Sequence, residues 1–514
     1  MSPLATRLRH MRLRLPLAAL VLSALALGGA PRGHAQTSAS PGSATAAPAP
    51  TCSSGTGQSS LQSAQDILDN LGQQDPVSAG AYATTAAYVA QFYPLWFTYY
   101  QSLGGSNQLI GPDRVSPIYN VVVLINVDTV YASAFLDLTA EPVIVTVPST
   151  PVNYSIQVLD SYGDIYSSDT TGFQPNIPGV YALIGPGGFS GTLPTSVTQT
   201  VTLPLNAMVL TFRADRHTPI SAGPPYNDVT DQANAFRTQL KLQTLSGYLS
   251  NPDGGAAQVL PEVYFAFPLK LTADELVARD PILFLRTLQF AVRSSRTPPM
   301  TPFEQALSSR FDALFGNGVA QRPEFAAGAQ LAHALIVNCY TTHTGPTNWV
   351  HFDNIGDWNG GTQVIDRSAI TEFCQYCNTI ATAAYYHAFE DAAGRQLDGR
   401  NPRGYVLTFP KQQIPQAMRF WSLTAYTPDT VELIPNPAQK YVVGSYTPGL
   451  QYNDSDGSLS LYISTVQPPG VPSANWLPAF PGPFNVALRI YGPTGDVSEN
   501  YDAGAYLPPG IQSR

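Results

Sequence analysis

The sequence predicts an α+β fold that is mainly β, with two antiparallel β-sandwich modules of jelly-roll-like form and a helical segment between them. Turn-forming residues are abundant, with 46 Pro and 41 Gly among 514 residues, and only 12% of the residues are charged. Typical globular domains carry about 25% charged residues, so a helix-rich cytosolic enzyme is disfavoured. Short apolar runs rich in Val, Ile and Tyr occur in two regions, and helical patterns lie between them. The 44% hydrophobic residues supply enough apolar surface for a core.

Residues 1–35 have the features of a signal peptide. Four arginines between Arg7 and Arg14 precede an apolar run at residues 15–27, and small residues flank His34 at the positions that signal peptidase reads. We therefore predict a periplasmic or secreted protein, with an uncleaved membrane anchor as the alternative. Loss of the five arginines of this segment changes the net charge from −9 to −14. Such acidity speaks against nucleic acid or an anionic membrane as a partner.

Residues 36–60 consist almost entirely of Ser, Thr, Ala, Pro, Gly and Gln, which predicts a disordered linker. The first β-sandwich module, with a helical lead-in, is predicted over residues 61–272. Its lead-in comprises helices at 61–71 and 79–103, and Pro94 is expected to kink the second helix. Aromatic residues lie on more than one face of that helix, which predicts that it is buried within the protein.

Strands are predicted after these helices, because the apolar pattern changes to short runs bounded by Pro, Gly, Asp or Ser. The expected strands of the first module are residues 121–125, 130–136, 142–147, 154–159, 180–184, 197–203 and 208–212.

A helical segment is predicted over residues 273–400, and the second β-sandwich module over residues 401–514. The helical patterns cover residues 273–315, with a break at Thr297-Pro298-Pro299, then 323–340 and 366–392. The expected strands of the second module are residues 405–409, 420–426, 440–446, 459–465 and 485–491. No stretch after the signal peptide is long and apolar enough to predict a transmembrane helix.

Two groups of motifs resemble a known pair of bacterial domains. The first resembles domain of unknown function 1254 and comprises Asn126-Val127-Asp128-Thr129-Val130-Tyr131, Phe135-Leu136-Asp137-Leu138 and Tyr154-Ser155-Ile156-Gln157-Val158-Leu159-Asp160-Ser161-Tyr162. The second resembles domain of unknown function 1214 and comprises Phe420-Trp421-Ser422-Leu423-Thr424-Ala425-Tyr426, Asn475-Trp476-Leu477-Pro478-Ala479 and Leu488-Arg489-Ile490-Tyr491-Gly492-Pro493. The resemblance covers most of residues 85–510. It implies two β-sandwich modules with helices between them, and it implies no activity.

One position departs from the family pattern. The family usually has Arg between Asn126 and Asp128, whereas this chain has Val127. If that Arg belongs to a charged site in relatives, the site is altered or inactive here.

Histidines and cysteines gather between His333 and His387, where three of the four Cys of the chain lie. Four Cys in an exported chain most simply form two disulfides, so Cys52, Cys339, Cys374 and Cys377 are disulfide candidates. We expect Cys339 to pair with Cys374 or Cys377. A metal bound by this His/Cys cluster is the less favoured alternative, because the spacing matches no standard zinc pattern. No metal site or cofactor is assigned.

Carboxylates among the predicted strands are candidates for acid–base chemistry. Asp128 and Asp160, together with His351 from a Gly/Asn-rich stretch, are the candidate catalytic residues. The alternative for Asp160 is that its side chain caps a turn at the end of a strand, and this alternative is favoured.

Aromatic residues in and beside the strands are candidates for ligand contacts, although aromatic side chains in sandwiches more often belong to the core. The candidate ligand-binding residues are Tyr131, Tyr162, Trp421, Asn475, Trp476 and Arg489. Trp476 is the strongest aromatic candidate, because it lies in a Pro-rich loop. Arg489 lies inside an apolar strand, so we expect it to pair with a carboxylate.

Several enzyme classes are excluded. No Lys follows a Gly, which excludes the Walker phosphate loop, and neither the zincin motif nor the Gly-x-Ser-x-Gly nucleophile elbow is present.

Three hypotheses about the function stay open. The first is binding of a carbohydrate or small organic ligand in an aromatic-lined groove. The second is a hydrolase or lyase that acts on an envelope glycan through carboxylate and His acid–base chemistry. The third is a structural envelope protein, which forms a homo-oligomer.

Overall fold

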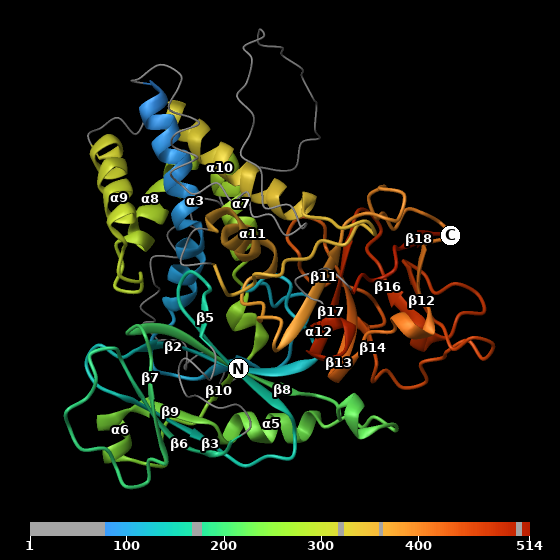
Figure 1. Ribbon diagram of the computed structural model, residues 1–514, viewed down its shortest axis with the longest axis horizontal. Coiled ribbons are helices and arrows are strands. Elements are labelled where there is room, and N and C mark those ends of the chain that lie inside the picture. Colours follow the sequence, from blue (N-terminus) through green and yellow to red (C-terminus); the bar gives the residue numbers. More distant parts are fainter. Residues whose placement is uncertain (1–77, 167–176, 317–322, 359–362, 500–505) are drawn as a thin grey trace, which may run out of the picture.

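The structure is a computed structural model that describes residues 78–166, 177–316, 323–358, 363–499 and 506–514. The expected signal peptide, the expected linker, the helix expected at 61–71 and Cys52 lie outside the described residues. The α+β fold is confirmed: helices gather in one region, and two groups of sheets lie beside it (Figure 1).

The first module contains two sheets that enclose a shared apolar core. One sheet has the strand order β10-β1-β2-β8-β4-β5 and the other β7-β6-β3-β9. Strand β2 buries Val130, Ala132, Ala134 and Leu136, which alternate along the strand, in that core. The bounds are β1 Ile110–Pro112, β2 Thr129–Asp137, β3 Val143–Val147, β4 Tyr154–Leu159, β5 Ile165–Tyr166, β6 Gly179–Ile184, β7 Gln199–Thr202, β8 Ala207–Asp215, β9 Lys241–Thr244 and β10 Gln258–Leu260.

Most strand pairs are antiparallel, as expected, but β1 pairs with β10 and β6 with β7 in parallel. Helices α5 (Thr230–Gln239) and α6 (Leu245–Ser250) also belong to this module, and the sequence pattern missed them.

The strand expected at 121–125 is wrong, because these residues form bends and turns. Leu124 has a φ of 55°, and this left-handed conformation is incompatible with an extended strand.

The helical region contains α3 (Ser78–Ser102), α7 (Leu269–Arg279), α8 (Pro281–Val292), α9 (Pro302–Phe315), α10 (Pro323–Thr342) and α11 (Val364–Cys374). As expected, α3 is buried, with Tyr88, Phe92 and Tyr93 fully inaccessible to solvent. It packs against α8, α9, α10 and α11 (Figure 1). An N-terminal capping box fixes the start of α9, since Thr301 and Glu304 each bond to the backbone of the other.

The second module again has two sheets, with strand orders β11-β17-β13-β14 and β16-β15-β12-β18. Trp421, Leu461 and Leu488 are fully buried in the core between them. The bounds are β11 Ala383–Ala388, β12 Tyr405–Phe409, β13 Ala417–Tyr426, β14 Val442–Gly444, β15 Leu459–Ser464, β16 Trp476–Pro478, β17 Asn485–Pro493 and β18 Gln512–Ser513. A short helix, α12 (Asp496–Glu499), follows β17.

The helix expected at 366–392 is wrong after Cys374. Residues 383–388 form β11, which pairs with β17 of the second module. Ala383 and Tyr385 face the helical core, whereas Ala384 and Tyr386 face the core of the second module. A strand that is buried on both faces shows no alternation of apolar and polar residues, so its pattern is easily mistaken for a helix.

None of the described helices is both long and apolar enough to span a membrane.

Candidate functional site

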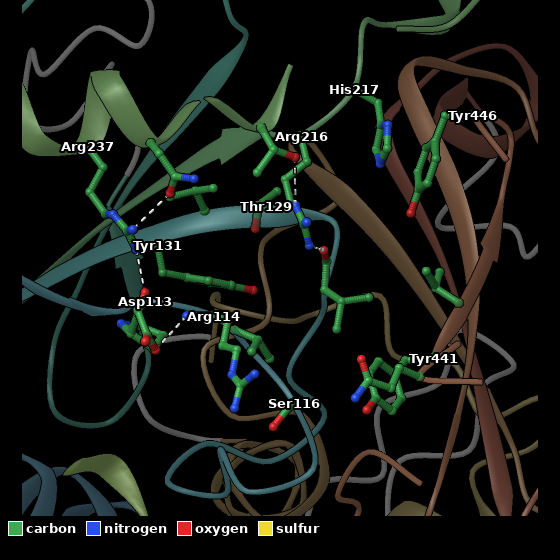
Figure 2. Close-up of a pocket in the computed structure, with 18 of the residues that line it drawn as sticks. Asp113, Arg114, Ser116, Thr129, Tyr131, Arg216, His217, Arg237, Tyr441 and Tyr446 are labelled. Atoms are coloured by element: carbon green, nitrogen blue, oxygen red, sulfur yellow. Dashed lines mark hydrogen bonds between the residues drawn. The ribbon is translucent and has the colours of Figure 1, made fainter. Parts of the chain in front are cut away.

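A cavity of about 530 Å³ lies between the first module and residues 439–446 of the second module (Figure 2). We call it the inter-module cavity. This volume is within the range of about 300–1,000 Å³ that is common for small-ligand pockets. Its walls are formed by residues 112–116 around the end of β1, Val127 and residues 129–131 at the start of β2, Arg216 and His217 after β8, Thr230, Asn234 and Arg237 of α5, and residues 439–442 with Tyr446.

Strand register brings the distant parts of the first module together at this cavity. Thr129 of β2 lies opposite Asp215 of β8, so the residues that follow β8 pass beside those that precede β2. The backbone N–H of Arg216 donates to the carbonyl of Asp128 at 3.1 Å. The side chain of Arg216 donates to the carbonyl of Val127 at 2.9 Å and to Thr230 Oγ1 at 3.1 Å. These bonds hold the Arg216 guanidinium in the wall of the cavity.

Basic residues outnumber acidic residues in the cavity wall, with Arg114, Arg216, Arg237 and Lys440 against Asp113. Arg114 is paired with the buried Glu262, at 2.6 Å from Nε to Oε1. The other three basic side chains bond to neutral acceptors. Arg237 donates to the carbonyl of Pro112 and to Asn234 Oδ1, and Lys440 donates to the carbonyl of Ser473. Within the described residues, none of these three makes an ion pair with a carboxylate.

Burial adds to the attraction of this cavity for a negative charge. Arg237 is 5% exposed, and its Nε is buried and has no hydrogen-bond partner. Burial lowers the pKa of Lys440 to about 8, so its amine is still mostly protonated at pH 7. An unneutralised cation in a partly buried site is poorly solvated, and an anionic ligand compensates for the lost solvation.

On the opposite wall, Tyr446 of the second module stacks on His217 of the first module (Figure 2). The ring centroids are 3.8 Å apart, and the planes differ by 9°. Tyr446 donates its hydroxyl to Asp128 Oδ1, and Ser422 donates to Asp128 Oδ2 at 2.9 Å. Burial, reinforced by the charge of Asp128, raises the pKa of Tyr446 well above its ordinary range. Tyr446 therefore stays protonated, and Asp128 orients it.

The catalytic candidates lie in different environments. Asp128 is buried behind Tyr446, one residue away from the cavity wall. Asp160 caps a turn, because its Oδ1 accepts the backbone N–H groups of Tyr162 at 2.8 Å and of Asp164 at 3.1 Å. His351 bonds through Nδ1 to the carbonyl of Tyr385 at 2.7 Å and stacks on Tyr386. Burial lowers the pKa of His351 to about 4, so its imidazole is neutral at pH 7.

Of the six ligand-binding candidates, Tyr131 lines the inter-module cavity. Tyr162 is buried below the guanidinium of Arg367, which lies 4.0 Å from its ring centroid. Trp421 belongs to the core of the second module. Asn475 and Trp476 hold the loop around β16, since Asn475 bonds to both backbone groups of Gln451 and Trp476 Nε1 donates to the carbonyl of Ser464 at 3.1 Å.

Arg489 is 1% exposed and holds the two modules together. Its Nη2 donates to the carbonyl of Leu124 in the first module and to the hydroxyl of Tyr426 at 2.6 Å. The expectation that Arg489 pairs with a carboxylate is therefore wrong, since a carbonyl and a phenol serve as its hydrogen-bond acceptors. The carboxylate of Asp215 bonds instead to Arg419 of β13, and this ion pair also joins the two modules.

The expected pairing of Cys339 with Cys374 or Cys377 is wrong, because Cys374 and Cys377 are bonded to each other. The two residues lie where α11 ends, and the chain turns back after Cys374 with Tyr376 at a φ of 60°. This turn brings the two sulfur atoms together, whereas the sequence pattern placed both residues inside one long helix.

Sequence reasoning missed the basic residues of the cavity. Arg216 follows β8 directly, and a charged residue at the end of an apolar strand is a signal that was available in the sequence. Arg237 on α5 and Lys440 before β14 carried no such signal, because only the folded chain brings α5 and residues 439–446 to the same cavity.

Comparisons with known proteins find two family matches and two similar solved structures. The family described as "Protein of unknown function (DUF1254)" matches residues 106–244, and the one described as "Protein of unknown function (DUF1214)" matches residues 382–495. None of the curated proteins matches the chain. The solved structure of the VPA0106 protein from Vibrio parahaemolyticus is 20% identical with a TM-score of 0.51, and the similarity covers 84% of this chain and 100% of that one. An uncharacterised protein from Burkholderia cenocepacia is 14% identical with a TM-score of 0.37, over 88% of this chain and 94% of that one. The first of these similarities shows a shared fold.

Proposed function

We propose that this protein is exported and binds a small organic anion in the inter-module cavity. The two matching families, DUF1254 and DUF1214, are both of unknown function, so the proposal rests on the site itself. Acidic sugars and other small carboxylic acids have the matching chemistry. The observation that carries this proposal is the group of Arg216, Arg237 and Lys440, three cations with neutral hydrogen-bond partners in the wall of one cavity. In a protein with a net charge of −9, such a group favours an anionic ligand.

Binding is favoured over acid–base catalysis by the groups that face the cavity. Burial raises the pKa of Tyr446 and lowers that of His217, so both groups are neutral near pH 7. Tyr131 and Tyr441 add aromatic surface on which the carbon skeleton of a ligand can pack. The proposal therefore agrees with the aromatic-lined groove expected from the sequence, and it specifies in addition that the ligand is negatively charged.

The test is a ligand panel on the purified chain, measured by calorimetric titration. Uronic acids and small mono- and dicarboxylates are compared with the corresponding neutral sugars and alcohols. We expect the acids to bind and their neutral counterparts to bind at least about tenfold more weakly, because a charge-assisted hydrogen bond contributes about 1.5–3 kcal/mol. Turnover of an acid during the titration would instead favour an enzyme.

A pair of variants tests whether the acids bind in the inter-module cavity. Arg216→Gln removes a cation of the wall and is expected to weaken binding of the acids by about tenfold or more. Arg279→Gln is the matched control, because Arg279 is an exposed residue of α7 whose partner, Glu275, lies on the same helix. Equal effects of the two substitutions, or equal binding of acids and neutral compounds, would contradict the proposal.

A further inference from the structure

The two ends of the inter-module cavity differ in charge. At one end lie Asp113, directly after β1, and Asn234 and Arg237 of α5. At the other end lies Arg216, directly after β8, and the aromatic ring of Tyr131 lies between the two ends (Figure 2). Each end therefore indicates the chemistry of the part of a ligand that would bind there.

The Arg216 end presents a positive charge that no carboxylate compensates. Arg216 bonds through Nε to Thr230 Oγ1 and through Nη1 to the carbonyl of Val127, and both acceptors are neutral. Its Nη2 bonds to none of the described residues, so this nitrogen can donate to a ligand. Guanidinium groups bind carboxylates through strong charge-assisted hydrogen bonds. The anionic group of the ligand is therefore expected at Arg216.

At the opposite end, a positive and a negative side chain lie near each other. Burial lowers the pKa of Arg237, and the charge of the nearby Asp113 opposes this shift. The two charges partly cancel, and a second anionic group of the ligand would be repelled by Asp113. This end therefore suits uncharged groups of the ligand.

The free polar atoms at this end are an acceptor and a donor. Asp113 Oδ1 accepts the backbone N–H groups of Arg114 and Glu262, each at 2.9 Å, whereas Oδ2 bonds to none of the described residues. Asn234 Oδ1 accepts from Arg237 Nη2 at 2.8 Å, and the Asn234 amide nitrogen donates to none of the described residues. Hydroxyl groups match both atoms, because a hydroxyl donates one hydrogen bond and also accepts. An alkyl chain would desolvate these polar atoms and leave them unpaired.

We propose that the ligand of the inter-module cavity is a sugar acid with a single carboxylate, such as a uronic acid. Its carboxylate lies at Arg216, its hydroxyl groups bond to Asp113 and Asn234, and its carbon skeleton packs on Tyr131. This inference rests on the proposed function, because it specifies which organic anion the cavity binds. Dicarboxylic acids are disfavoured, since Asp113 repels a second anionic group.

The test compares four acids by calorimetric titration of the full chain: glucuronate, galacturonate, tetrahydropyran-2-carboxylate and adipate. Tetrahydropyran-2-carboxylate has the ring and the carboxylate of a uronate without its hydroxyl groups, and adipate has six carbons with a second carboxylate. We expect the tighter-binding uronate to bind at least about tenfold more tightly than either of the other two acids, because hydrogen bonds to charged groups are strong.

The outcomes separate this inference from the proposed function. If tetrahydropyran-2-carboxylate or adipate binds as tightly as the uronates, the inference is overturned and the binding of organic anions stands. If none of the four acids binds, the proposed function is contradicted as well.

Two substitutions probe the two ends of the cavity. Asp113→Asn keeps the oxygen that accepts the backbone N–H groups and removes the charged acceptor. The preference for the uronate over tetrahydropyran-2-carboxylate should therefore fall by at least about fivefold, and adipate should bind more tightly. Arg216→Gln should weaken the binding of both ring compounds and leave the ratio of their affinities within about twofold of its original value.

Asp231→Asn is the matched control for Asp113→Asn. Asp231 is an exposed residue in the first turn of α5 and lies outside the cavity wall as the structure describes it. It should leave the ratio unchanged, and melting curves without ligand verify that each variant is folded. A ratio that Asp113→Asn leaves unchanged, or that Asp231→Asn lowers equally, overturns the inference.

Discussion

Asp160, a catalytic candidate from the sequence, holds a turn through one of its carboxylate oxygens. Its Oδ1 accepts two backbone N–H groups, which is the turn-capping role favoured by the sequence. Burial, together with the charge of Asp164, raises the pKa of Asp160 from 3.8 to about 7. The folded protein therefore holds a proton on Asp160 in a pH range in which the unfolded chain has lost it.

This raised pKa has a direct consequence for stability. Between about pH 4 and pH 7 the folded state binds more protons at Asp160 than the unfolded state does, so the free energy of unfolding decreases as the pH rises through this window. Asp160→Asn keeps the accepting oxygen and removes the titration. We expect the variant to gain stability relative to the unmodified chain from pH 4 to pH 8, by up to a few kcal/mol at about 1.4 kcal/mol per pKa unit.

Urea unfolding at pH 4.5 and pH 8 measures this difference. Asp164→Asn is the comparison, because Asp164 shares the environment and its charge contributes to the raised pKa of Asp160. A difference between Asp160→Asn and the unmodified chain that is the same at both pH values would show that Asp160 does not titrate in this window. Turnover of a glycan that is lost in Asp160→Asn at unchanged stability would support the catalytic hypothesis instead.

Val127, at the position where the family resemblance implies an Arg, lines the inter-module cavity and is 8% exposed. The departure from the family pattern therefore lies in the candidate site. Val127→Arg adds a cation to the wall, and we expect it to tighten binding of the smallest carboxylates by about fivefold, equivalent to about 1 kcal/mol. Val127→Leu is the control for reduced volume without charge. Weaker binding in both variants would mean that space, and not charge, limits the ligand.

Elements with clear periodicity were predicted well. The strands β2, β4 and β8 and the buried helix α3 lie close to their expected positions, because short apolar runs bounded by turn-forming residues indicate strands and the long aromatic run of α3 indicates a helix. The pattern failed at β11, which is buried between two cores, and at residues 121–125, where Leu124 adopts a left-handed conformation. The cause at β11 is not local, since the core on each side of this strand is formed by residues from elsewhere in the chain.

The candidate site was also predictable only in part, because residues that are distant in the sequence form its walls. Tyr131 and Asp128 were identified from motifs, and they lie in or directly behind the cavity wall. Arg216, Arg237 and Lys440 come from three elements that the tertiary fold alone brings together. Trp421 and Asn475 belong to specific motifs, but their contacts stabilise the core and a loop.

The ion pair between Arg419 of β13 and Asp215 of β8 joins one sheet of each module. The side chain of Asp215 is 1% exposed and that of Arg419 is 13% exposed. Arg419→Met leaves the Asp215 carboxylate buried without its partner and is expected to lower the free energy of unfolding by about 3–5 kcal/mol.

The double variant Asp215→Asn/Arg419→Met removes both charges, so it should recover much of this loss. Chemical denaturation of the two single variants and the double variant gives the coupling energy between the residues. Additive losses in the double variant would mean that the pair does not connect the modules energetically.

At the scale of the whole molecule, the walls of the inter-module cavity come from both modules. In the proposed binding mode, a ligand contacts Arg216 and Arg237 on one side and Lys440 on the other, so we expect it to stabilise the modules together. A saturating acid at about 100 times its dissociation constant should add about 2.7 kcal/mol to the free energy of unfolding. Hydrogen exchange should show increased protection in β2 and in β14 together. Protection confined to one module would place the ligand elsewhere.

The burial of residues 83–98 of α3 also has consequences for how the protein forms. This helix ends at Ser102, whereas α10 and α11, which cover it, begin at Pro323 and Val364. The contacts are far apart in sequence, so they form slowly compared with local ones. A nascent chain therefore carries the aromatic surface of α3 uncovered until its C-terminal half is present, and this surface is where a chaperone would bind and where aggregation of an incomplete chain would begin.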